Sequence, residues 1–151
     1  MHKQRKLRDR NVPPIDRRGF LTPQKGILGA NMEKRGLVID DSEQTRKNLI
    51  EILKGAKLFN VYLEAEDGVE AFRILSRDKV DIIISDVIMP RMDGFKFLAL
   101  VKKDRELRDI PVIMLTIRGE MIDKIRGLEI GADDYIIKPF NADELIAKVK
   151  V

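Results

Sequence analysis

Cysteine, histidine and long apolar runs are missing or scarce in this 151-residue chain, and each absence excludes a class of function. There is no cysteine, which excludes disulfide frameworks and thiolate chemistry and fits a cytoplasmic location. The single histidine, His2, lies at the amino end, so sites built on several histidines are excluded. No apolar run approaches the roughly 18 residues of a membrane span, and no secretory signal pattern is present. With 44% hydrophobic residues, the chain predicts one soluble domain with a sizeable core.

Charge is distributed unevenly along the chain. The formal net charge is +4, yet residues 1–31 hold eight basic and two acidic side chains, so the remainder carries −2. The first segment also contains three prolines and no apolar periodicity. We therefore predict a basic flexible arm or linker at 1–31 and a folded domain at 32–151. Such an arm suits contacts with nucleic acid or another anionic surface, although a flexible extension, linker or cloning remnant is the plainer interpretation.

From residue 36 onward, short apolar runs alternate with segments of helical periodicity. The apolar runs predict strands at 36–40, 59–65, 80–85, 110–116 and 134–138. The periodic segments predict helices at 42–56, 67–77, 93–104, 119–131 and 141–151. Ser42 and Asp67 are suitable caps for the first two helices. Strands that are apolar on both faces indicate a parallel sheet with helices on both sides.

Polar side chains follow the predicted strands at their carboxyl ends. The apolar run in IIISDVIMP (82–90) ends on Asp86, the first strand ends at Asp40 and Asp41, the fourth at Thr116 and the fifth at Lys138. Ligands of open parallel sheets bind outside the carboxyl ends of the strands. Taken singly, these residues have plainer interpretations, such as helix capping for the acidic pair. Their convergence on one edge indicates a functional acidic site.

The charges of this site favour a bound cation. Three carboxylates and one ammonium leave a net −2 if all are ionised, which is costly without a further positive charge. Mg²⁺ suits a few carboxylates together with water and phosphate oxygens. An aspartate beside the metal can attack a phosphoryl group and form an aspartyl phosphate. Lys138 and the metal would stabilise the transferring oxygens, and Thr116 would donate a hydrogen bond to one of them.

Four segments carry a resemblance to a known family. The segments are LVIDDSEQTR, DIIISDVIMPRMDG, PVIMLT and GADDYIIKPF. Together, residues 36–151 resemble the receiver domain of two-component response regulators. The resemblance implies an α/β fold of the flavodoxin-like type: a doubly wound five-stranded parallel sheet in the order 2-1-3-4-5, with helices on both faces.

The resemblance also assigns roles to the site residues. Asp86 would be the phosphoacceptor, and Lys138 would contact the phosphoryl group. The Mg²⁺ ligands would be Asp41, Asp86 and the backbone carbonyl of Ile88, with Asp40 acting partly through water.

A conformational switch is implied as well. Thr116 would move toward the phosphoryl group, and Tyr135 would turn inward to fill the vacated space. The peptide bond before Pro139 is often cis in the family, and Gly94 resembles the glycine that ends the active-site loop. Ile117 departs from the pattern, since the family usually has a small residue there, and we expect it to crowd the entrance to the site.

The function implied is that of a signalling domain and not of an enzyme. It would accept a phosphoryl group from a sensor histidine kinase or a phosphotransfer protein, then switch conformation to control an output. We expect no membrane association and no nucleic-acid binding by the domain itself. Two alternatives stay open: a pseudo-receiver that only docks partners, and a haloacid-dehalogenase-like phosphatase. The phosphatases carry their nucleophile on the first strand in a DxD arrangement, where this chain has DDS at 40–42.

A phosphorylation-dependent homodimer is a further hypothesis, through the fourth helix, fifth strand and fifth helix. Charged residues of both signs stand on this face, as in DNA-binding regulators of the family: Lys124, Glu129, Asp133, Asp134, Glu144, Lys148 and Lys150. Leu128 and Ala147 would form an apolar patch between them. The alternative is that Glu144 and Lys148 pair within one helix and contribute little.

Overall fold

The computed structural model describes residues 17–19, 33–117 and 129–150. The chain divides into two units, Met1–Glu33 and Lys34–Val151, and the second contains the strands and helices described here. Its strands are β1 (Arg35–Ile39), β2 (Val61–Ala65), β3 (Ile82–Asp86), β4 (Val112–Ile117) and β5 (Asp134–Lys138). Its helices are α2 (Glu43–Gly55), α3 (Gly68–Arg77), α4 (Gly94–Lys103) and α6 (Ala142–Lys150).

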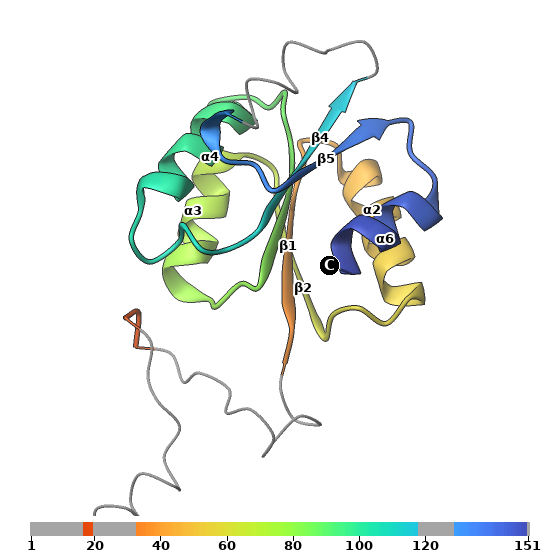
Figure 1. Ribbon diagram of the computed structural model, residues 1–151, viewed down its shortest axis with the longest axis horizontal. Helices are drawn as coiled ribbons and strands as arrows, with labels where there is room; N and C mark the ends of the chain where they lie inside the picture. Colours follow the sequence, from red (N-terminus) through yellow and green to blue (C-terminus); the bar gives the residue numbers. More distant parts are fainter. Residues whose placement is uncertain (1–16, 20–32, 118–128, 151) are drawn as a thin grey trace, which may run out of the picture. The chain divides into compact units, whose positions relative to one another are not determined.

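The five strands form one parallel sheet in the order β2-β1-β3-β4-β5, which confirms the predicted fold class. In this sheet Ile39 of β1 is level with Ala65 of β2 and with Ser85 of β3. Helices α2 and α6 cover one face, and α3 and α4 cover the other (Figure 1). All five carboxyl ends therefore lie along the same edge of the sheet.

Alternate residues of each strand enter different cores, which explains why the strands read as continuous apolar runs. In β1, Leu37 and Ile39 belong to the cluster that includes α3 and α4, whereas Val38 belongs to the cluster with α2 and α6. In β4, Met114 and Leu115 divide in the same way. A strand buried on both faces needs apolar side chains at every position, as the sequence predicted.

The two predicted helix caps are confirmed. The Ser42 hydroxyl accepts a hydrogen bond from the backbone N–H of Thr45 at 3.2 Å, and α2 starts at the next residue. The Asp67 carboxylate accepts one from the N–H of Glu70 at 2.9 Å, and α3 follows it. Each cap satisfies an amide that the first helical turn leaves without a partner.

Some strand boundaries differ from the predictions by one or two residues. The predicted strand at 59–65 begins at Val61, because the preceding Asn60 is part of a turn in which its side chain accepts from the N–H of Lys34 at 2.8 Å. The predicted strand at 80–85 runs over 82–86 and so includes the aspartate itself. Periodicity indicates the run, while local hydrogen bonds set its ends.

The predicted helix at 119–131 lies mostly outside the described residues, which exclude 118–128. Residues 129–130 are helical, and Gly131 follows them with a φ of 125°. Glycine adopts this left-handed conformation readily, which suits a helix end. Among the helices in the described ranges, none has the length and apolar composition that crossing a bilayer requires.

Candidate functional site

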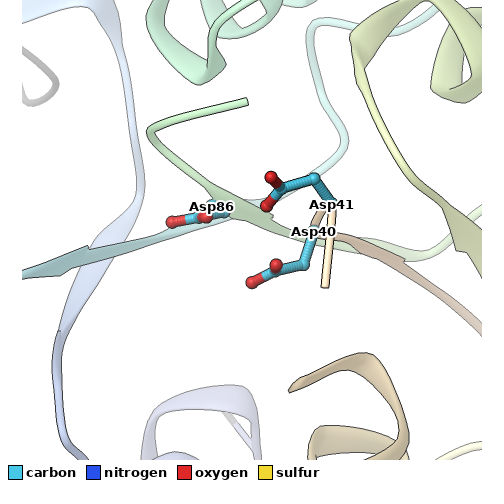
Figure 2. A group of neighbouring side chains, drawn as sticks. All are labelled: Asp40, Asp41 and Asp86. Atoms are coloured by element: carbon cyan, nitrogen blue, oxygen red, sulfur yellow. The ribbon is translucent and has the colours of Figure 1, made fainter. Parts of the chain in front are cut away.

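Three carboxylates meet where β1 and β3 end. Asp40 and Asp41 directly follow β1, and Asp86 is the last residue of β3, the adjacent strand. One oxygen from each lies within 4.8 Å of the others (Figure 2). The structure thus brings together the acidic residues that the sequence predicted for a metal and phosphoacceptor site. Carboxylate oxygens at such distances suit a hard divalent cation.

Asp40 is the most constrained of the three. Its side chain is buried, with one oxygen accepting from the N–H of Ser42 at 2.8 Å and the other from Lys138 Nζ at 3.2 Å. Its backbone N–H donates to the carbonyl of Ala65 at 3.1 Å. Asp41 is exposed by contrast. The pair therefore offers one fixed carboxylate and one that reaches solvent.

Lys138, at the end of β5, bridges two of the carboxylates. Its Nζ lies 3.2 Å from Asp40 Oδ2 and 3.3 Å from Asp86 Oδ1. Burial alone would lower the pKa of Lys138, but the carboxylates of Asp86 and Asp40 raise it overall. The side chain therefore remains an ammonium at neutral pH. The peptide bond between Lys138 and Pro139 is cis, as the sequence led us to expect.

Asp86 has a raised pKa. Burial is the largest influence and raises it, Lys138 acts in the opposite direction, and the charge of Asp40 adds to the rise. One oxygen also accepts from the N–H of Val87 at 2.9 Å. Ionised Asp86 therefore costs folding free energy above the ordinary carboxyl pKa, where the unfolded chain ionises more easily. An added cation at the cluster would reduce this cost.

The two residues predicted for the switch lie on the neighbouring strands. Asp86 is level with Leu115 of β4, so Thr116 lies one residue nearer the carboxyl edge, and it is buried. Tyr135 of β5 is level with Met114 and is buried in the cluster that includes α3 and α4. The tyrosine is thus already packed inward in this structure.

Two isoleucines near the site are exposed. Ile88, whose backbone carbonyl was predicted as a metal ligand, lies two residues after Asp86 with 63% of its surface exposed. Ile117 ends β4 directly after Thr116 and is 54% exposed. These two side chains flank the ends of β3 and β4, next to Asp86 and Thr116.

Gly94 lies against the end of β3. A Cβ atom built there would collide with the backbone oxygen of Asp86 and would lie 2.8 Å from the Cα of Val87. Its N–H donates to the carbonyl of Val87 at 2.7 Å. Only glycine permits this close approach of the start of α4 to the end of β3.

Sequence reasoning missed Arg46, one turn into α2. Its Nη1 donates to the backbone carbonyl of Asp40 at 2.5 Å, and its Nε donates to Glu64 Oε1 at 3.1 Å. The arginine therefore helps to hold the backbone of the acidic pair in place. The only sequence indication was a basic residue in the first turn of the helix that follows the pair.

The charged residues predicted for a dimer face are partly engaged within the chain. Asp133 accepts from the N–H of Val112 at 2.8 Å and lies 3.3 Å from Lys102 Nζ. Asp134 lies 3.0 Å from Lys148 Nζ. Lys124 and Leu128 lie outside the described residues. Partners in a second copy would have to compete with these contacts.

A groove of about 440 Å³ lies beside Lys138, between α2 and the segment after β5. Its lining residues combine polar and apolar side chains: Thr45, Asn48, Glu51, Ile52, Lys138, Pro139 and Phe140.

Comparison with known proteins gives the family. A model described as the response regulator receiver domain matches residues 37–150. The phosphate regulon transcriptional regulatory protein PhoB of Klebsiella pneumoniae is 43% identical over 119 residues, which cover 79% of this chain and 51% of that protein. The transcriptional regulatory protein CpxR of Klebsiella pneumoniae subsp. pneumoniae is 45% identical over 119 residues, 79% of this chain and 48% of that protein. The chain spans about half the length of these relatives.

Solved structures agree with the family match. The chemotaxis response regulator CheY4 of Vibrio cholerae is similar with a TM-score of 0.72 and 32% identity, covering 79% of this chain and 98% of that one. The signal receiver domain of a signal transduction histidine kinase from Syntrophus aciditrophicus is similar with a TM-score of 0.71 and 40% identity. This match covers 78% of this chain and 87% of that one. The chain therefore belongs to the receiver domains of two-component response regulators.

Proposed function

We propose that this domain accepts a phosphoryl group on Asp86. One oxygen of the carboxylate attacks phosphorus, the bond from phosphorus to the donor atom breaks, and the donor leaves with that electron pair. The observation that carries the proposal is the cluster of three carboxylate oxygens within 4.8 Å, with Lys138 in contact with two of the residues. Lys138 would stabilise the negative oxygens of the transferring group, and Thr116 would donate a hydrogen bond to one.

Mg²⁺ fits the donor set of this site. The ligands would be Asp41, Asp86 and the backbone carbonyl of Ile88, with Asp40 contributing partly through water. When bound, the ion would offset the two negative charges that remain after Lys138 and would lower the cost of ionising Asp86. Arg46 and the Ser42 N–H would hold Asp40 in place throughout.

We further propose that Thr116 and Tyr135 form the switch. Thr116 would move toward the phosphoryl group, and the buried ring of Tyr135 would occupy the space that it leaves. The domain would act as a phosphorylated signal and not as an enzyme with an external substrate. Residues 1–31 would be a separate arm before the domain at 32–151.

A sensor histidine kinase or a phosphotransfer protein is the proposed donor, in the cytoplasm. The groove beside Lys138 supports this, because Ile52 and Phe140 offer apolar surface next to the site. A homodimer through the fourth helix, fifth strand and fifth helix is the proposed response to phosphorylation. It requires Asp134 to exchange its contact with Lys148 for one in the second copy.

The phosphatase alternative is disfavoured by the position after the acidic pair. Ser42 caps α2 with its side chain, so no carboxylate stands two residues after Asp40 as a DxD motif requires. The pseudo-receiver alternative is disfavoured because the acidic pair, the acceptor and the lysine are all present and in contact range.

Titration with Mg²⁺ followed by beryllofluoride, observed by amide NMR, tests the proposal. We expect saturable shifts around Asp86 with Mg²⁺ and a second set, including Thr116 and Tyr135, with beryllofluoride. The Asp86→Asn variant should lose the second set. A wild-type protein that takes neither ligand is a docking module, and the proposed function is then wrong.

A further inference from the structure

The loop after the proposed phosphoacceptor, residues 87–93, is tied to the sheet at its two ends. The N–H of Val87 donates to the carbonyl of Leu115 at 3.2 Å, and the N–H of Gly94 donates to the carbonyl of Val87 at 2.7 Å. These bonds fix the two ends of the loop, at Val87 and at Gly94. The middle of the loop, which includes the Ile88 carbonyl, must be fixed by other contacts.

Arg91 supplies such contacts from the middle of the loop. Its Nη2 lies 3.1 Å from Glu66 Oε1 and is in contact with Asp67 Oδ2. The next residue, Met92, packs on Gly68, where a Cβ would lie 2.8 Å from the methionine sulfur. Two consecutive loop residues thus hold the segment between β2 and α3. We name the contacts of Arg91 with Glu66 and Asp67 the Arg91 clasp.

Asp67 makes this clasp more than a surface ion pair. Its side chain is fully buried, and one oxygen is used to cap α3. The other oxygen is buried without a regular hydrogen bond, and the guanidinium of Arg91 lies against it. Burial alone would raise the pKa of Asp67, but the N–H of Glu70 and the charge of Arg91 lower it overall. An ion pair with one buried partner is more costly to break than one between two exposed side chains, so this contact favours the observed position of the loop.

The backbone at Arg91 has an uncommon conformation, which local contacts must maintain. Arg91 has a φ of 64°, in the left-handed region that non-glycine residues seldom adopt. Such a conformation is unfavourable for a residue with a side chain and persists where surrounding contacts impose it. A backbone bond from the N–H of Met92 to the carbonyl of Pro90 at 2.6 Å closes a tight turn at Arg91. The side chain of Arg91 adds the contacts with Glu66 and Asp67, which hold this turn against the segment before α3.

We propose that Arg91 is a positioning residue, which holds loop 87–93 in the conformation that places the Ile88 carbonyl beside Asp86 before any metal binds. This inference rests on the proposed function of Asp86 for its consequence, since a preformed loop strengthens Mg²⁺ binding. The claim about the loop itself concerns the metal-free protein.

Amide hydrogen exchange of the metal-free protein and calorimetric titration with Mg²⁺ test the proposal. In Arg91→Ala, exchange within 87–93 should become faster, and Mg²⁺ affinity should fall about tenfold, the lower end of what removing a group that supports a ligand costs. The matched control is Lys57→Ala, which removes another exposed basic side chain from a left-handed position, with a φ of 55°. It should change neither quantity.

A second variant separates positioning from stability. Arg91→Ala with Asp67→Asn removes the uncompensated buried charge, while asparagine can still cap α3. This double variant should recover thermal stability but keep the fast loop exchange and the weak Mg²⁺ binding. If its Mg²⁺ affinity and loop exchange instead match those of Lys57→Ala, Arg91 only compensates Asp67 and the proposal is wrong. If the wild type itself binds no Mg²⁺, the proposed function fails. The role of the Arg91 clasp in holding the loop is then tested by amide hydrogen exchange within 87–93 alone, which should still be faster in Arg91→Ala than in the wild type.

Discussion

Replacing Gly94 by alanine should disturb the site more than the same exchange at Gly55 or Gly68. The added Cβ would collide with the backbone oxygen of Asp86 and would lie 2.8 Å from the Cα of Val87 and 2.9 Å from the methyl of Met114. The methionine can move aside at small cost. The two backbone atoms cannot, because they belong to the last residue of β3 and to the first residue of the loop that follows it.

The loss of folding stability in Gly94→Ala is the difference between two opposing effects. Forcing a methyl group into a packed position typically costs about 1–3 kcal/mol. Alanine in place of glycine in a helix returns at most about 1 kcal/mol. The net loss is therefore at most about 3 kcal/mol, and its midpoint of about 1.5 kcal/mol would lower Tm by about 6 °C for a domain of this size.

Two other glycines provide the controls. Gly55, at the end of α2, has no atom within 4 Å of an added Cβ, so Gly55→Ala should leave Tm unchanged or slightly higher. At Gly68 the obstacle is the flexible side chain of Met92, so Gly68→Ala should be intermediate. Thermal unfolding measured by circular dichroism gives the order of the three variants, and calorimetric titration gives their Mg²⁺ affinity.

We expect Tm to decrease in the order Gly55→Ala, Gly68→Ala, Gly94→Ala. Gly94→Ala should also bind Mg²⁺ most weakly of the three. Should Gly94→Ala unfold at the same temperature as Gly55→Ala and bind Mg²⁺ equally well, the close approach of α4 to β3 would have no role in the site. The packing argument would then be refuted.

Three further predictions concern the surroundings of the site. Ile117→Ala should lose its phosphoryl group faster than the wild type, because the isoleucine limits the approach of water; equal or slower loss refutes this. Deleting residues 1–31 should change the free energy of unfolding by less than about 1 kcal/mol in a denaturant titration, and a larger loss would mean that the arm docks on the domain. Beryllofluoride should convert the protein to a dimer in sedimentation, and Lys124→Glu should abolish it; a protein that stays monomeric at high micromolar concentration contradicts the proposed face.

Much of the fold was predictable from the sequence because burial on both faces leaves a clear pattern. Runs such as III at 82–84 and VIML at 112–115 have no polar face, which is typical of strands in a parallel sheet that is covered on both sides. The acidic site was predictable for a related reason. Parallel strands align their carboxyl ends, so residues far apart in sequence, such as Asp40 and Lys138, were expected to meet and do so at 3.2 Å.

The contacts that were not predicted depend on long side chains reaching across loops. Asp67 was predicted as a cap, and it is one, but its second oxygen meets Arg91 from a different loop. Arg46 reaches back to the backbone of Asp40 in a similar way. Asp134 was assigned to contacts between two copies, whereas the structure pairs it with Lys148 of the same chain. Periodicity and strand order place backbones, and they do not say which of several nearby charges a long side chain meets.

The central claim, that Asp86 is the phosphoacceptor, is tested most directly by intact mass after incubation with Mg²⁺ and a small acyl phosphate. The wild type should gain one phosphoryl group, which hydroxylamine should remove, as expected for an acyl phosphate. The exposed aspartate Asp109 provides the matched control, so Asp109→Asn should gain the group as the wild type does. Asp86→Asn should gain none. If Asp86→Asn is phosphorylated as readily as Asp109→Asn, the acceptor lies elsewhere and the account of the site is wrong.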